Sequence, residues 1–218
     1  MNEFIWYFSI FVLGSFLGWL LETIWCVIKN SKLESRKGLI YGYYIPIYGI
    51  ATVFISLVVE MFSVKNIWLI MLITFIICFI VEYFSSLFQE KCFGMKSWDY
   101  SKMILNINGR VNVIYLIVWS FLGILWSKYY AIVLKFIFAT LLKFKVLNLV
   151  AIGYFIYMIL NCSISIIACT RQKMRKMGIN TGNRFELWID KHYNDEYMKK
   201  VYANATFVDL RKYKRVKN

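Results

Sequence analysis

The chain has few charged residues, one histidine and one proline. Only 17% of its 218 residues are charged, 12 of them acidic, whereas 60% are hydrophobic. A soluble domain usually has about 25% charged and about 45–50% apolar residues, so a soluble fold of this size could not bury so much apolar surface. This composition excludes soluble enzymes, secreted disulfide scaffolds and disordered proteins, and it indicates an integral membrane protein.

Sequence motifs for metal, nucleotide and hydrolytic chemistry are missing as well. The one histidine, His192, lies in the polar C-terminal part, the five cysteines form no CxxC pair, and no GxxxxGK[ST] segment occurs. An imidazole-rich metal site and nucleotide hydrolysis by a P-loop are therefore not expected. Neither GxSxG nor HExxH occurs. We therefore expect that the chain is not an enzyme and that it binds no metal and no cofactor.

Long apolar runs predict an all-α, polytopic helical membrane protein. A membrane-spanning helix needs about 20 mostly apolar residues. Five such helices are expected, over residues 4–28, 45–64, 67–88, 111–126 and 147–169, which form a transmembrane domain of residues 1–170. Between residues 128 and 145 three lysines lie seven and eight residues apart, which favours an interfacial amphipathic helix over a sixth span.

The excess of basic residues predicts the orientation. The net charge is +14, and residues 171–218 hold 13 basic and 5 acidic residues. The loops after the first and third spans are basic too, so we expect the N-terminus outside and a basic tail, 171–218, in the cytoplasm. Membrane orientation accounts for the charge, and no nucleic-acid partner is expected. The tail is expected either to lie on anionic lipid or to bind an acidic partner.

Two acidic residues lie deep in the expected spans. An ionised acid there costs about 2.5–3.5 kcal/mol on insertion scales, so Glu22 and Glu82 need partners, whereas Glu60 lies near a span end and can reach water. The loops return Arg36 and Arg110, which we expect to pair with Glu22 and Glu82. These ion pairs would either lock helix to loop or form part of a transport pathway.

The two helix–loop–helix segments share a weak repeat. GWLLETIW and CFIVEYFS each place a glutamate six residues before the expected end of a span, and each is followed by a basic loop with an arginine near a glycine. The first loop holds the only proline and is expected to be either a re-entrant entry into the second span or a plain tight loop.

These motifs together resemble a known family. The order GWLLE, RKGLIYG, PIYG, a glutamate-bearing third span, WDYS and NINGRVN is similar to the CmpB-like family of type IV ABC-transporter membrane proteins, over about residues 5–170. The sequence departs from the family at Gly42-Tyr43, where the family often has Gly-Pro, and in the basic tail. The resemblance implies a bacterial plasma-membrane permease that works with a separate ATP-binding subunit.

The resemblance also supplies signature positions. We expect one group of them to line a substrate pathway or gate: Glu22, Arg36, Tyr48, Glu82, Asp99, Asn106 and Arg110. A second group is expected to shape the loops: Gly38, Gly42, Pro46, Gly49, Trp98, Tyr100 and Gly109. Because five spans are few for a permease, a homo- or hetero-oligomer in the lipid bilayer is expected. The alternative is a sensor, assembly or resistance protein that acts through its basic tail.

Overall fold

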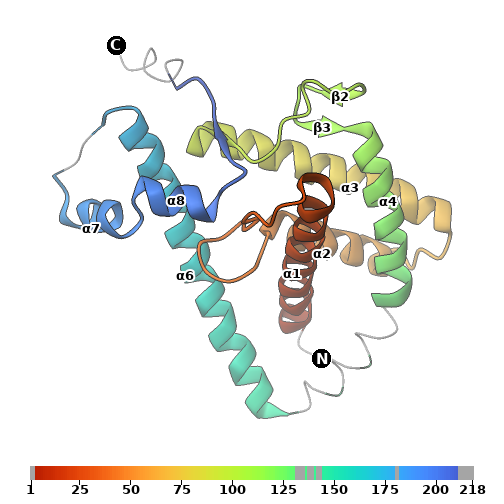
Figure 1. Cartoon of the computed structure of the whole chain (residues 1–218). Coiled ribbons are helices and arrows are strands. Elements are labelled where there is room, and N and C mark those ends of the chain that lie inside the picture. The colour runs from red at the N-terminus through yellow and green to blue at the C-terminus, as the bar shows by residue number, and fades with distance from the viewer. Residues whose placement is uncertain (1–2, 131–135, 137–139, 141–143, 180–181, 211–218) are drawn as a thin grey trace.

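The computed structural model describes residues 3–130, 136, 140, 144–179 and 182–210, and this part of the chain is mostly helical (Figure 1). Seven α-helices occur in the described part: α1 Glu3–Asn30, α2 Pro46–Met61, α3 Ile67–Phe88, α4 Val113–Leu125, α6 Lys145–Lys176, α7 Arg184–His192 and α8 Asp195–Val201. Two π-helical turns, η1 Gln89–Phe93 and η2 Trp126–Tyr130, continue α3 and α4.

Short β-strands modify the all-α prediction. Strand β1 (Met95–Lys96) pairs antiparallel with β4 (Thr206–Phe207), and β2 (Asn106–Ile107) pairs antiparallel with β3 (Val111–Asn112). Each strand has two residues. These ladders do not form a sheet layer; they tie the third loop to the C-terminal segment and to itself.

The apolar helices lie where the apolar runs predicted them. In the described part of the chain, α1, α3 with η1, and α6 are long and apolar enough to cross a membrane. Helices α2 and α4 have 16 and 13 residues. At about 1.5 Å per residue α2 is roughly 24 Å long, shorter than a hydrocarbon core of about 30 Å. Most of the predicted interfacial helix, 128–145, lies outside the described residues.

Local sequence explains where the helices begin. Side chains of asparagine accept hydrogen bonds from backbone N–H groups in the first turns of four helices, and these N-caps are Asn66 (α3), Asn112 (α4), Asn183 (α7) and Asn194 (α8). An asparagine cap satisfies N–H groups that have no intrahelical acceptor. Pro46 begins α2, where a missing N–H does no harm.

Small residues bring the helices of each hairpin close together. A Cβ atom on Gly14 of α1 would collide with Thr52 of α2, and one on Gly123 of α4 would collide with Thr74 of α3. In lipid, apolar side chains gain no hydrophobic free energy when helices associate. Close approach of the helix backbones, which small residues permit, therefore contributes much of the packing energy. The chain therefore folds into two hairpins, α1–α2 and α3–α4.

The two hairpins contact each other through aromatic and polar groups. The indole N–H of Trp126 donates to Ser56 Oγ at 2.9 Å, joining η2 to α2. The rings of Tyr48 and Trp119 meet edge to face, with centroids 5.5 Å apart. These contacts place the first turn of α2 against α4 and its middle against η2.

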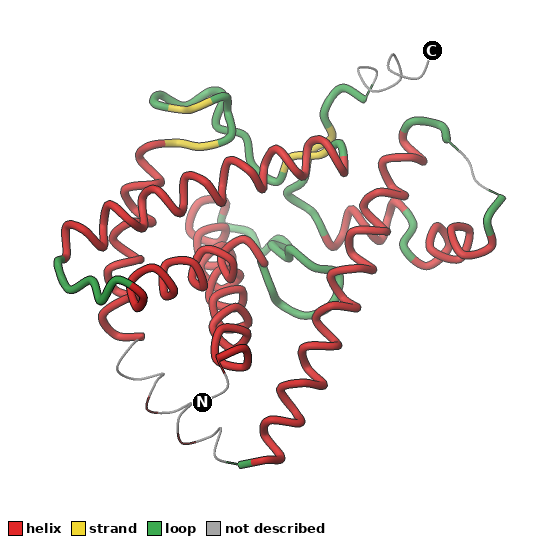
Figure 2. The backbone as a smooth tube through the Cα atoms, turned by 180° about the vertical axis from the view of Figure 1, so that it is seen from behind, coloured by secondary structure: helices red, strands yellow, loops and turns green. Residues whose placement is uncertain are grey.

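Helix α6 lies to one side of the hairpins in both views (Figures 1 and 2). It contacts α1 through Phe155, whose ring meets Phe4 and Phe8 edge to face at 4.8 and 5.1 Å. It runs on to Lys176, past the predicted end at 169 and past the expected domain boundary at 170. The predicted tail therefore begins inside a helix.

The C-terminal helices pack against both cytoplasm-directed loops of the prediction. One buried cluster joins residues of both loops, α6, α7 and α8: Ile40, Met95, Ala168, Cys169, Ile189, Tyr193 and Met198. Ser35 Oγ also donates to the backbone oxygen of Val201 at 2.6 Å. Residues 184–207 thus pack against the two loops and α6 at this end of the molecule.

Candidate functional site

Glu22 is bound by a tyrosine of the neighbouring helix. The hydroxyl of Tyr48, in α2, donates to Glu22 Oε1 at 2.7 Å. Gly18 makes room for this tyrosine, because a Cβ atom there would collide with the Tyr48 ring. The pattern GWLLE thus combines a glycine, which admits the ring, with a glutamate one turn later that accepts its hydroxyl.

Glu82 is the more deeply buried acid. Its side chain lies in α3 with the residue only 8% exposed. The hydroxyl of Tyr100, in the third loop, donates to Glu82 Oε1 at 3.0 Å. The other carboxyl oxygen, Oε2, is buried with no hydrogen-bond partner among the described residues. The Tyr100 ring lies 5.2 Å from that of Tyr115, in α4.

The two acid–tyrosine pairs form one group, which we call the carboxyl cluster (Glu22, Tyr48, Glu82 and Tyr100). Both tyrosines contact α4, since the Tyr48 ring meets Trp119 with centroids 5.5 Å apart and the Tyr100 ring lies 5.2 Å from that of Tyr115. The cluster therefore lies where the two hairpins meet.

The predicted ion pairs Glu22–Arg36 and Glu82–Arg110 are wrong. Arg36 donates to Cys26 Sγ at 3.3 Å and lies 3.9 Å from Glu34. Arg110 forms an ion pair with Glu90 at 2.6 Å and donates to Ser86 Oγ at 3.2 Å. Both arginines bind nearer the helix ends, where they remain partly exposed, so neither guanidinium has to be fully desolvated.

The arginine contacts support the internal repeat. Arg36 binds Cys26, four residues after Glu22, and Arg110 binds Ser86, four residues after Glu82. Residues four apart lie on the same face of a helix, so each arginine contacts its helix one turn beyond the glutamate. The tyrosines break this symmetry, because Tyr48 comes from a helix and Tyr100 from a loop.

Residues of the third loop position Tyr100. Trp98 Nε1 donates to the backbone oxygen of Arg110 at 2.8 Å, and the N–H of Tyr100 donates to the oxygen of Gly109 at 2.8 Å. Asn106 accepts from the N–H of Gly109 and donates to a backbone oxygen. Gly109 has φ +68°, a conformation that favours glycine.

Asp99 lies outside the carboxyl cluster, on the exposed surface of this loop. It accepts from the N–H of Ser101 at 2.9 Å and from Lys96 Nζ at 3.3 Å. The hydrogen bonds from Ser101, helped by Lys96, hold the pKa of Asp99 below its ordinary value. Asp99 and Asn106 therefore shape the loop that carries Tyr100, and the structure does not bring them to Glu22 or Glu82.

The first loop is irregular and is held by α6. The N–H of Tyr41 donates to Asn161 Oδ1, the amide of Asn161 donates to Tyr41 O at 2.8 Å, and the N–H of Ile40 donates to Ser165 Oγ at 3.0 Å. Irregular backbone near a membrane needs such partners. Asn161 and Ser165 were not among the predicted site residues, although polar residues inside an apolar run were the signal for them.

Glycines and the proline set the shape of this loop. Gly42 has φ +75°, which favours glycine. A Cβ atom on Gly38 would lie 2.8 Å from Pro46 Cδ, and one on Gly49 would collide with the backbone oxygen of Phe11. These contacts direct the loop from α1 into α2, so that Tyr48 faces Glu22.

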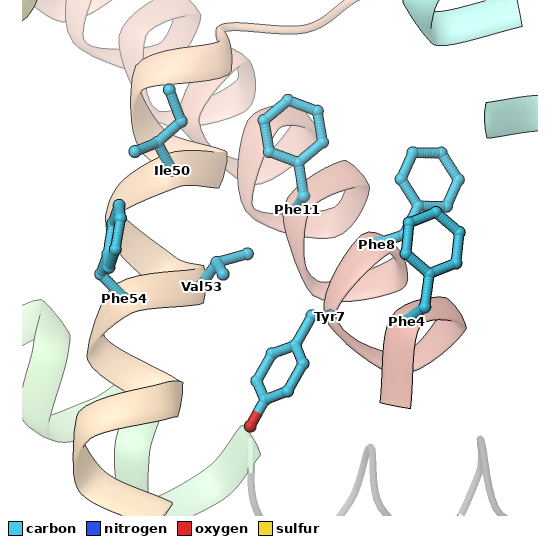
Figure 3. A pocket seen from close by; sticks show the side chains of 7 residues that line it. All are labelled: Phe4, Tyr7, Phe8, Phe11, Ile50, Val53 and Phe54. Carbon is cyan, nitrogen blue, oxygen red and sulfur yellow. The ribbon is translucent and has the colours of Figure 1, made fainter. Parts of the chain in front are cut away.

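A separate apolar groove lies between the first half of α1 and α2 (Figure 3). Its volume is about 370 Å³, and its lining is Phe4, Tyr7, Phe8, Phe11, Ile50, Val53 and Phe54. The hydroxyl of Tyr7 donates to Glu60 at 3.2 Å. No predicted pathway residue lines the groove, and its lining suits hydrocarbon rather than a polar ligand.

Comparison with known protein families shows which family the chain belongs to. The family model described as "Putative ABC-transporter type IV", of the CmpB kind, matches residues 9–166. The chain belongs to this family. All four residues of the carboxyl cluster lie inside the match, whereas α7 and α8 lie beyond it. No curated protein and no solved structure matches the chain.

Proposed function

We propose that this CmpB-family chain is a permease-like membrane subunit of a bacterial transport system, energised by a separate ATP-binding subunit. The observation that carries the proposal is the carboxyl cluster between two helical hairpins. Ionisable side chains at this depth are costly and rare, and where they occur they usually mark a binding site or a pathway. In this proposal the chain is not itself an enzyme, and nucleotide hydrolysis takes place on the partner.

We infer five crossings with the N-terminus outside from the five apolar runs and the basic loops. Helices α1 and α6 begin at one end of the molecule and run toward the other, α4 runs back, and α2 and α3 lie across them in this view (Figure 1). The first loop, the third loop and the C-terminal helices meet at the same end. These segments are basic, so by the positive-inside rule that end lies on the cytoplasmic side of the bacterial plasma membrane.

The acid–tyrosine bonds suggest how the site would open. A hydrogen bond to a charged group contributes about 1.5–3 kcal/mol, whereas breaking a buried ion pair costs about 3–5 kcal/mol. Glu22–Tyr48 and Glu82–Tyr100 therefore separate more easily than the predicted arginine pairs would. In the proposed cycle, one hairpin moves against the other, and these two bonds break and re-form as access changes.

The partner is tested by purification from native membranes. The tagged chain is extracted in mild detergent and its stoichiometric companions are identified, with an unrelated polytopic protein carrying the same tag as the control. We expect an ATP-binding subunit, in a homo- or hetero-oligomer containing the chain. Recovery of the folded chain without any ATP-binding companion would contradict the proposal.

The docked C-terminal helices favour one alternative, a sensor, assembly or resistance protein that works through this part of the chain. Tyr41 of the first loop hydrogen-bonds Tyr193 at 2.8 Å, and β1 of the third loop pairs with β4. Under this alternative, undocking α7 and α8 abolishes activity, whereas substitutions in the carboxyl cluster leave it unchanged.

A further inference from the structure

Helix α7 has two unlike faces. Its inner face carries Ile189, which is 1% exposed, and the acids Glu186 and Asp190. Its outer face, which we call the basic aromatic face, is solvent-accessible in the structure and consists of Arg184, Phe185, Leu187, Trp188 and Lys191. The three apolar members are 54%, 51% and 46% exposed, which is unusual for side chains of this kind so close together.

Both acidic side chains of α7 form ion pairs with arginines of α6. Asp190 forms ion pairs with Arg171 at 2.6 Å and with Arg175, and Glu186 lies 3.0 Å from Arg171. Burial opposes ionisation of Asp190, but the hydrogen bonds and charges of the two arginines outweigh it and lower its pKa. The outward face is therefore left with basic and apolar side chains and with His192, whose ring lies 4.4 Å from that of Trp188.

The position of α7 along α6 gives its depth. Ile189 packs in one cluster with Ala168 and Cys169 of α6, and Asp190 binds Arg171, the first charged residue after Lys145 in that helix. Helix α7 thus lies beside the turn where the apolar part of α6 ends. In a spanning helix this turn lies at the headgroup layer.

We propose that the basic aromatic face of α7 binds anionic phospholipid headgroups at the cytoplasmic surface of the membrane. Arg184 and Lys191 contact the phosphates, while Trp188 and Phe185 enter the interface between headgroups and acyl chains, where amphipathic aromatic rings are favoured. The inference rests on the orientation given with the proposed function, and it goes beyond the family match, which ends at residue 166.

Charge and depth favour lipid over an acidic soluble protein as the occupant. Stacked Phe185 and Trp188, with ring centroids 6.4 Å apart, lie on the same face as the two basic residues, and this face flanks the last apolar turn of α6. In the proposed orientation this face lies at the headgroup layer, so lipid reaches it directly, whereas an acidic soluble protein would have to displace lipid headgroups.

Hydrogen exchange of the full chain in nanodiscs tests the proposal. The nanodiscs contain either phosphatidylcholine alone or a mixture with phosphatidylglycerol, and exchange in α1, which none of the variants changes, serves as the internal reference. We expect exchange of the α7 amides to slow several-fold when phosphatidylglycerol is present. The Arg184→Gln, Lys191→Gln double variant should lose this effect.

The matched control is the Lys199→Gln, Lys200→Gln double variant, which removes the same charge from exposed positions of α8 and should keep the lipid effect. Equal α7 exchange in the two lipids would overturn the proposal, as would protection that soluble polyglutamate confers and phosphatidylglycerol does not. The measurement needs neither an ATP-binding partner nor transport, so its failure is distinguishable from failure of the permease proposal.

Discussion

At the scale of single residues, tyrosines take the place that the sequence assigned to arginines. A tyrosine hydroxyl can donate to a buried carboxyl without bringing a second charge out of water, whereas a guanidinium would have to be desolvated. Arg36 and Arg110 instead bind Cys26 and Ser86, one turn nearer the helix ends. The signature positions Tyr48 and Tyr100 therefore have a direct physical role, as hydrogen-bond donors to the two deep acids.

Replacing Tyr100 by phenylalanine tests this role. The change removes the hydrogen bond that the buried Glu82 carboxyl accepts from Tyr100, and we expect a loss of stability on the order of 1–3 kcal/mol. Thermal unfolding in detergent micelles measures it. Tyr43→Phe is the matched control, because Tyr43 is 52% exposed and its change should leave the unfolding temperature unaltered. Equal unfolding temperatures for the two variants would contradict the assignment.

The acid Asp190 gives a pH prediction. Its pKa is lowered in the fold, so the stability that it contributes is present above its unfolded pKa, about 3.9, and is lost as the pH falls through the lowered folded value. Limited proteolysis between α6 and α7 should therefore increase below about pH 4.

The control for this prediction is Asp190→Asn, which should be cleaved readily at neutral pH and show a weaker dependence on acid. A wild-type cleavage pattern that stays constant down to pH 3, or an Asn variant that is as resistant as the wild type, would show that the contact does not hold α7.

At the scale of helices, the apolar runs predicted where the helices are but not how they end or what they contact. Runs of apolar residues determine α1, α3 and α6 directly. The end of α6 at Lys176 was missed because Arg171 looks like the start of a polar tail, whereas in the fold Asp190 and Glu186 neutralise it. Such partners lie far along the chain, so local sequence cannot reveal them.

The glycines of the hairpins give a prediction at this scale. In Gly49→Ala the new Cβ atom would collide with the backbone oxygen of Phe11, so α1 and α2 must separate, and we expect destabilisation of about 1–3 kcal/mol from overpacking. Gly153→Ala is the matched control within α6, where, apart from the chain neighbours and the helix's own backbone, no atom of the described residues lies within 4 Å of the added group. Alanine there should be neutral or stabilising by up to about 1 kcal/mol. Thermal unfolding compares the two, and equal effects would show that the close approach at Gly49 is unimportant.

At the scale of the whole molecule, two hairpins, α6 and the C-terminal helices form one folded unit joined at the end that carries the basic loops. Asn161 and Ser165 attach the first loop to α6, and the cluster around Ile189 attaches α7 and α8 to both loops. Movement of one hairpin against the other would therefore also displace the C-terminal helices. Truncation at Thr170 would cut α6 before its end at Lys176, so single substitutions test the tail more cleanly than its removal.

ATP hydrolysis by the complex of this chain with the proposed ATP-binding subunit, measured in nanodiscs, tests the central claim most directly. We compare the Glu22→Gln, Glu82→Gln double variant with a Glu3→Gln, Glu196→Gln control, which amidates two exposed acids instead. The account predicts that both variants assemble with the ATP-binding subunit and that only the cluster variant loses most of the hydrolysis rate. Full hydrolysis by a correctly assembled cluster variant would contradict it.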